Sequence, residues 1–232
     1  ILKRFTNVFE QAYTRFLDLQ KAEAQAREAQ IELALERVRA RTMAMHKSEE
    51  LLEAANLLYS EFRSLGITQY FTCGFVLVDE ESNSQHVSIT NFDGDVFQSF
   101  KLPLTGDPVF QLRYERWKQK DPVFYQEVGG EELKKHVAFA IPHFGSKEAE
   151  EMVATQFPDP TFFYMGNFSH GYLHIVGDSK LTAEEEALLA RFTRVFEMTY
   201  KRFLDLQKAE AQAREAQIQL ALERVRARTM AM

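Results

Sequence analysis

The chain has 232 residues, a net charge of −6, and 45% hydrophobic against 27% charged residues. This balance is typical of a folded domain and excludes a disordered chain. A single cysteine excludes a disulfide framework and a cysteine-based zinc site, and no apolar stretch approaches the ~20 residues of a membrane-spanning helix. The first five residues resemble a helix interior rather than a signal peptide, so we expect a segment of a longer protein.

The two ends of the chain are near-copies of each other. Residues 5–45 and 192–232 differ at only five of 41 aligned positions, with an offset of 187 residues. Such an offset is too long for a solenoid repeat of about 20–50 residues, so we expect a tandem array of a domain plus a linker. The charge divides in the same way, as +2 over residues 1–45, −12 over 46–187 and +4 over 188–232.

The first copy predicts a long helix. Residues 1–65 contain no Gly or Pro, and apolar residues recur at heptad spacing in two segments that are out of phase near residues 20–30. So long a helix extends beyond a domain of about 140 residues and would leave its apolar side in water. We therefore favour a parallel homodimer in which two such helices pair. The alternative is a helix folded back on its own domain. The residues expected along the dimer seam are Phe9, Phe16, Leu17, Ile31, Leu35 and Val38.

The acidic middle of the chain begins with an amphipathic helix that we expect to stop at Gly66. Continuous or alternating apolar residues then predict three strands, at 70–78, 86–90 and 100–104. Asp107 followed by Pro108 predicts the start of a short helix through Lys118, because Asp is a favoured N-cap and Pro a favoured first helical residue.

The second half of the middle segment predicts three further strands, at 123–128, 161–168 and 172–176, with short helices at 131–139 and 146–156 between the first two. Thr182 and Glu185 form a capping box that opens the final long helix. Short connections between strands favour an antiparallel sheet. We therefore predict an α+β fold, with about six antiparallel strands, short helices on one face and the long N- and C-terminal helices on the other.

Two stretches of this segment resemble the GAF domain, a ligand-sensing or relay module. One runs from Glu49-Glu50-Leu51-Leu52 to Gly66-Ile67 and into a glycine-containing apolar strand. The other is the strand Gly171-Tyr172-Leu173-His174-Ile175-Val176 followed by Leu181-Thr182-Ala183-Glu184-Glu185. The resemblance covers residues 48–200. It implies a signalling helix at 1–47, a GAF-like sensor domain at 48–187 and a second signalling helix at 188–232.

The linker ALERVRARTMAMHKSEEL at residues 34–51 is similar to the joint between tandem GAF-like repeats of bacterial sensor histidine kinases. Two ligand classes of the family are disfavoured. The cyclic-nucleotide motif NKFDE has only a partial counterpart at residues 91–93, and Cys73 lies in a predicted strand, where a bilin-attaching cysteine is not expected.

The remaining polar motifs predict no metal site and no catalytic set. His170 and His174 have i,i+4 spacing, but in a turn and a strand four residues span roughly 13 Å. His46 and His136 lie in charged helical surroundings and are interpreted as solvated, whereas Cys73 is interpreted as a small buried hydrophobe. The acidic residues at 148–151 and the arginines at 37, 39 and 41 are interpreted as solvated helix faces, so nucleic acid is not an expected partner.

The aromatic residues are the strongest candidates for a ligand site. In a GAF-like arrangement, the predicted short helices and the strand at 161–168 would wall a pocket opposite the long helices. That pocket would suit a small, flat or hydrophobic ligand of unknown identity. The alternative, that these side chains only fill the core, stays open. The candidate ligand-binding residues are Phe110, Tyr114, Trp117, Phe139, His143, Phe162, Tyr164 and Asn167.

Together these features predict a cytoplasmic, non-enzymatic sensor or relay module of a signal-transduction protein. The resemblance implies a histidine kinase parent in a two-component phosphorelay, with neighbouring GAF-like repeats and a C-terminal output domain as partners. The alternative is a structural spacer that binds nothing and only sets length and dimerisation.

Overall fold

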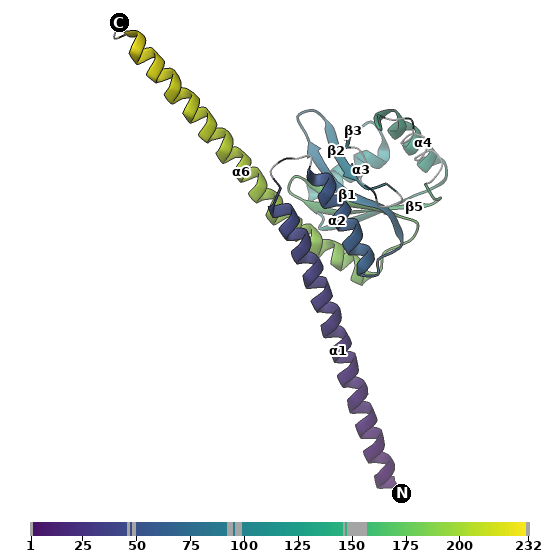
Figure 1. Ribbon diagram of the computed structural model, residues 1–232. Coiled ribbons are helices and arrows are strands. Elements are labelled where there is room, and N and C mark those ends of the chain that lie inside the picture. The colour runs from purple at the N-terminus through teal and green to yellow at the C-terminus, as the bar shows by residue number, and fades with distance from the viewer. Residues whose placement is uncertain are drawn as a thin grey trace. The chain divides into compact units, whose positions relative to one another are not determined.

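The computed structural model describes residues 2–230 except 46, 48, 49, 92–94, 96–98, 146 and 148–156. The chain forms two units, Ile1–Arg37 and Val38–Met232. The first unit consists of the greater part of helix α1 (Leu2–Met43), a single uninterrupted helix as predicted (Figure 1). None of the described helices has an apolar stretch of the length and hydrophobicity needed to cross a lipid bilayer.

The second unit is built on a six-stranded antiparallel sheet in the order β3-β2-β1-β6-β5-β4 (Figure 1). Every strand predicted from the sequence is present, within two residues at each end, and the predicted α+β class is confirmed. The first and last strands of the domain proper, β1 and β6, pair at the centre, with Gly74 opposite His174. The strands are β1 (Tyr70–Asp79), β2 (Ser84–Ile89), β3 (Phe100–Pro103), β4 (Val123–Val128), β5 (Thr161–Phe168) and β6 (Gly171–Gly177).

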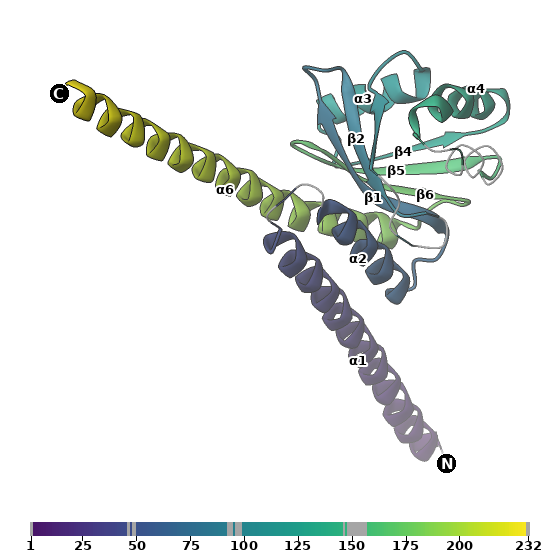
Figure 2. The same ribbon diagram turned by 45° about the horizontal axis from the view of Figure 1, so that its top comes forward.

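One face of the sheet is covered by α2 (Leu51–Ser64) and by the first part of α6 (Ala183–Met230) (Figure 2). Aromatic contacts hold this layer together. The ring centroids of Phe62 and Phe192 are 4.8 Å apart between the two helices, and Phe75 of β1 stacks on Phe196 of α6 at 4.0 Å. All four side chains are fully buried, so this helix layer and the sheet share one apolar core.

The opposite face carries α3 (Pro108–Gln119) and α4 (Gly130–Ala140), followed by a short 3₁₀ turn, η2 (Ile141–His143) (Figure 2). The predicted helix start at Asp107 is confirmed, because its Oδ1 accepts from the backbone N–H groups of Val109 and Phe110 at 3.0 Å. The predicted helix at 146–156 lies outside the described residues. Layers on both faces of the sheet agree with the prediction.

Helix α6 is continuous over 48 residues, so the domain boundary expected at residue 188 falls inside it. The capping box is present: Thr182 N–H donates to Glu185 Oε2 at 2.7 Å, and Glu185 N–H donates to Thr182 Oγ1 at 3.3 Å. Helix α6 has buried side chains as far as Phe203, whereas the described side chains from residue 205 to residue 226 are all exposed. One helix therefore runs without interruption from the core of the domain into solvent.

Candidate ligand-binding site

A cavity of about 60 Å³ lies between the sheet and the layer formed by α3 and α4. Five strands and both helices contribute side chains to it, and most of its wall is apolar. Strand alternation explains this. On β6, Tyr172, His174 and Val176 point to the cavity, while Leu173 and Ile175 point to the helix layer on the other face. The apolar wall includes Val76, Val87, Phe100, Phe110, Phe163 and Val176.

Arg113 of α3 brings a positive charge to this apolar wall. Its side chain is buried, its Nε–H donates to Gln126 Oε1 at 3.1 Å, and its guanidinium carbon lies 4.0 Å from the centre of the Phe163 ring. Burial lowers the pKa of Arg113 to about 10, so it keeps its proton at neutral pH. The Nη2 atom is buried and has no hydrogen-bond partner among the described residues. A buried cation with an unused donor is energetically costly unless an acceptor reaches it.

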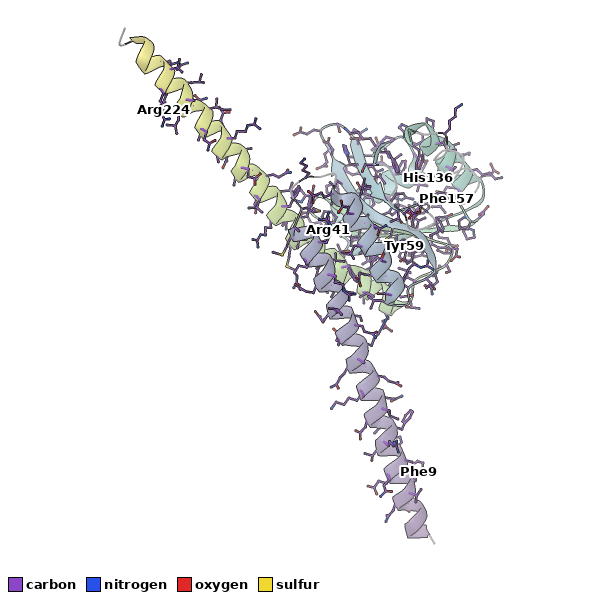
Figure 3. All side chains as sticks on the ribbon, in the orientation of Figure 1. Phe9, Arg41, Tyr59, His136, Phe157 and Arg224 are labelled. Carbon is purple, nitrogen blue, oxygen red and sulfur yellow. The ribbon has the colours of Figure 1, made fainter. Side chains whose placement is uncertain are left out.

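His136 of α4 is buried, so the interpretation of this residue as solvated is wrong. The charged neighbours Lys134 and Lys135 face outward, while His136 lies on the inner face of the helix. Its Nδ1–H donates to Asp107 Oδ1 at 2.8 Å, and its ring packs edge-on against Phe110 at 4.6 Å. Figure 3 labels His136 together with Phe157, another residue of the cavity wall.

The Asp107–His136 pair is neutral on the histidine and charged on the carboxylate. Burial lowers the pKa of His136, and the hydrogen bond to Asp107 opposes this only in part. Burial alone would raise the pKa of Asp107, but the hydrogen bonds from His136 and from the Phe110 N–H outweigh it, so this pKa is lowered. Asp107 therefore uses its carboxylate both to start α3 and to orient His136.

Two further polar groups reach the cavity from β6. The Tyr172 hydroxyl donates to Gln85 Oε1 at 2.5 Å, and burial raises the pKa of this tyrosine to about 12, so it stays neutral. His174 stacks against Phe163, with ring centroids 5.9 Å apart. Burial, followed by the positive charge of Arg113, lowers the pKa of His174 well below its ordinary value. Its Nε2 is buried and has no partner among the described residues.

The structure brings one of the eight candidate ligand residues, Phe110, to the cavity wall. Phe139 and Trp117 pack around the same core, and the Trp117 indole N–H donates to the Phe168 carbonyl at 2.8 Å. Tyr114 reaches outward, with its hydroxyl donating to Glu80 Oε1 at 2.5 Å.

The other four candidates lie away from the cavity wall. His143 is exposed, and the Asn167 amide donates to the Asp121 carbonyl at 2.8 Å. Phe162 and Tyr164 are on the α6 side of the sheet because they alternate with Phe163 along β5. The expectation that Phe162 and Tyr164 line the same pocket as Phe110 is therefore corrected.

The sequence does not predict the polar residues of the cavity as a set; they are Thr72, Gln85, Thr90, Arg113, His136, Tyr172 and His174. One signal was available: Arg113 occurs three residues after Phe110 on one face of a short helix, where a solvated arginine would not be expected. The interpretation of Cys73 is confirmed, since it is fully buried. His170 lies in the turn before β6 and His174 within that strand, as expected. The described residues contain no group of three or more His, Cys, Asp or Glu that could hold a metal.

The residues expected along a dimer seam divide into two sets. Phe9, Phe16 and Leu17 are exposed, whereas Ile31, Leu35 and Val38 are buried in the single chain. The second copy of the repeat behaves differently. Its equivalents of the buried set are all exposed, namely Ile218, Leu222 and Val225.

No protein family model and no curated protein matches the chain. Among solved structures, it is similar to one described as the structure of the GAF domain, with 12% identity, coverage of 75% of this chain and 88% of that chain, and a TM-score of 0.46. A putative GAF sensor protein from Burkholderia vietnamiensis is 11% identical, and the match covers 73% of this chain and 92% of that chain, with a TM-score of 0.38. Residues 122 to 287 of a methyl-accepting chemotaxis protein are 11% identical, and the match covers 73% of this chain and 97% of that chain, with a TM-score of 0.41. At this similarity, conclusions about function depend on the residues of the chain itself.

Proposed function

We propose that this chain is a regulatory sensor and relay module of a signal-transduction protein, without catalytic activity of its own. A small ligand in the cavity between the sheet and α3–α4 would be the input, and a shift of α6 the output. The sequence resemblance to GAF domains and the repeated helical linker support this role. The parent protein would be a cytoplasmic sensor histidine kinase with further repeats and a C-terminal output domain.

The observation that carries the proposal is the position of β5 and β6 between the cavity and α6. Phe163 of β5 and His174 of β6 face the cavity, while Gly166 and Tyr164 of β5 face α6 or the turn that leads into it. The Tyr164 hydroxyl accepts from the Leu181 N–H at 2.9 Å, directly before α6 begins. A ligand that displaces these strands must therefore also displace the start of a helix that continues to Met230.

The exposed part of α6 would transmit the change through a homodimer. Ile218, Leu222 and Val225 follow i, i+4, i+7 spacing, which places them on one stripe of the helix, and each is between 45% and 62% exposed. A helix in water gains stability when such a stripe packs against an identical stripe of a second chain. Two helix registers of similar energy, with different affinities for the ligand, would make the module a switch.

Disulfide crosslinking tests the dimer. In a Cys73→Ala background, Ile218→Cys is expected to form covalent dimers rapidly under mild oxidation. Ala216→Cys is the matched control, because it is also exposed but lies about 160° away around the helix. Equal crosslinking at both positions, or a monomeric protein by sedimentation at high concentration, would contradict the paired helices.

A cavity-filling substitution tests the relay without any ligand. Ala140→Met adds three heavy atoms to the cavity wall, whereas Ala138→Met makes the same change at an exposed position of the same helix. The relay predicts that only the first variant changes the crosslinking rate of Ile218→Cys. An unchanged rate in a folded Ala140→Met protein would support the spacer instead.

A further inference from the structure

We propose that the cavity binds a short-chain aliphatic monocarboxylate, with Arg113 as the residue that pairs with the carboxylate and His174 as a second donor. The proposal deepens the sensor function above and depends on it for its biological consequence. It rests on the chemistry of the cavity itself: one buried cation, two unused nitrogen atoms and an aliphatic and aromatic wall.

Arg113 provides the positive charge. Its side chain is only 4% exposed, and no ion pair joins it to a carboxylate among the described residues. Gln126 holds Nε and the ring of Phe163 covers one face of the guanidinium, so the side chain is fixed while Nη2 stays free. A planar anion is the ligand that a fixed guanidinium with a free N–H recognises best.

Among the described residues, no carboxylate lines the cavity or forms an ion pair with Arg113. Asp107 is the nearest carboxylate in electrostatic terms, but it accepts from His136 and from two backbone N–H groups at the start of α3. Tyr172 is neutral and already donates to Gln85. Asp107 therefore acts on Arg113 only at a distance, and Nη2 of Arg113 remains available to a ligand.

His174 supplies the second contact. It is 8% exposed, lines the same cavity and is close enough for Arg113 to influence its protonation. A neutral imidazole carries one N–H, and the tautomer with the proton on Nε2 can donate to a carboxylate oxygen. Two donors from different elements, α3 and β6, would then hold the two oxygen atoms of one carboxylate.

The size and the walls of the cavity define the remainder of the ligand. One water needs roughly 10–15 Å³ of such volume, so about 60 Å³ has room for some four to six heavy atoms. A carboxylate uses three of them, which leaves an aliphatic tail of about one to three carbons, with butyrate at the upper limit. Val76, Val87 and Val176 offer that tail an apolar surface.

Isothermal titration calorimetry of the full chain with sodium butyrate tests the proposal. Butyramide has nearly the same shape without the charge, and butylammonium has the opposite charge. We expect butyrate to bind about 10- to 100-fold more tightly than butyramide, as for the loss of a charge-assisted hydrogen bond, and butylammonium not to bind. Equal affinity for butyrate and butyramide would overturn the assignment, and this comparison requires no variant to fold.

Variants on α3 then identify the residue. Arg113→Met should weaken butyrate binding by about 10- to 100-fold and butyramide binding by a smaller factor, because the amide loses only a hydrogen bond without opposite charge. Arg116→Gln is the matched control, because Arg116 lies on the same helix but is partly exposed, does not line the cavity and pairs with Asp121 at 3.4 Å. Unchanged butyrate affinity in folded Arg113→Met protein, checked by circular dichroism, would refute the role of Arg113.

The failure of this proposal can be distinguished from failure of the sensor function. If butyrate binds through Arg113 but the Ile218→Cys crosslinking rate does not respond, the site is supported and the relay is refuted. If butyrate does not bind while Ala140→Met still changes crosslinking, the relay is supported and the carboxylate assignment is refuted.

Discussion

Gly166 lets α6 pack directly on the backbone of β5, and its replacement by alanine should separate these two elements. A Cβ at this position would lie 2.0 Å from Thr193 Oγ1, 3.2 Å from Thr193 Cβ and 3.3 Å from Leu189 Cδ1. Thr193 cannot turn away freely, because its hydroxyl is buried and donates to the Leu189 carbonyl at 2.8 Å. The backbone angles at Gly166 are ordinary for a strand, so the clash alone decides the effect.

Overpacking of this kind costs about 1–3 kcal/mol of unfolding free energy. For a domain of this size, that corresponds to a decrease of roughly 3–10 °C in the melting temperature. Thermal unfolding followed by circular dichroism measures the change. Thr193→Ala removes the atom at the shortest distance and leaves only the two longer contacts, so we expect it to restore most of the stability of Gly166→Ala.

A double-mutant cycle makes this reasoning testable. Thr193→Ala alone should cost about 1 kcal/mol or less, because the lost hydroxyl bonds only within its own helix. The coupling between the two substitutions should then be at least about 1 kcal/mol in the favourable direction. Additive effects, or a Gly166→Ala protein as stable as the wild type, would show that α6 does not lie against β5 in this way.

Three further predictions concern stability. His174 is neutral in the fold with its pKa lowered, so its contribution to the free energy of unfolding is present above pH 6.5 and is lost at lower pH, where the unfolded chain takes up a proton. Urea denaturation at pH 7 and pH 5 should therefore show a loss of unfolding free energy that is smaller by roughly 1–2 kcal/mol in His174→Phe than in the wild type. Parallel pH profiles of the two proteins would contradict this. Asp107→Ala should lower the free energy of unfolding by about 1–3 kcal/mol in the same assay, because α3 loses its N-cap and His136 loses its hydrogen-bond partner. Asp107→Asn should cost less, and the reverse order would rule out the capping role. In monomeric protein at low concentration, Val38→Ala should lower the free energy of unfolding by about 1–3 kcal/mol and Val225→Ala by less than about 0.5 kcal/mol. The reason is that Val38 is 1% exposed and Val225 is 62% exposed. Similar losses would show that the two valines share one environment.

The strands and helix starts of the domain could be predicted because each depends on local chemistry. Asp107 before Pro108 and Thr182 before Glu185 satisfy the first backbone N–H groups of their helices with their own side chains. A continuous run of apolar residues, as in β5, is enough to predict a strand that is buried on both faces. It does not reveal which face of the sheet each residue occupies, and for this reason Phe162 and Tyr164 were expected on the wrong side.

The candidate site could not be predicted in the same way. Arg113, Gln85 and His174 come from α3, β2 and β6, and only the order of the strands places them around one cavity. The charged sequence neighbours of His136 predict a solvated side chain, yet helix geometry turns it inward to Asp107, 29 residues earlier. Burial and partner choice for a polar side chain depend on contacts that are distant in sequence, and no local pattern encodes them.

The repeated linker separates the two kinds of information most clearly. Residues 33–45 and 220–232 have the same sequence, and wherever the structure describes both copies over residues 33–43 and 220–230, that sequence forms a helix. The helix is thus determined locally, by residues with high helix propensity and by the absence of Gly and Pro. The environment is not: Val38 is buried and Val225 is exposed, although their neighbours in the chain are identical. Burial of an apolar side chain requires a second surface to pack against, and only the tertiary structure supplies that surface.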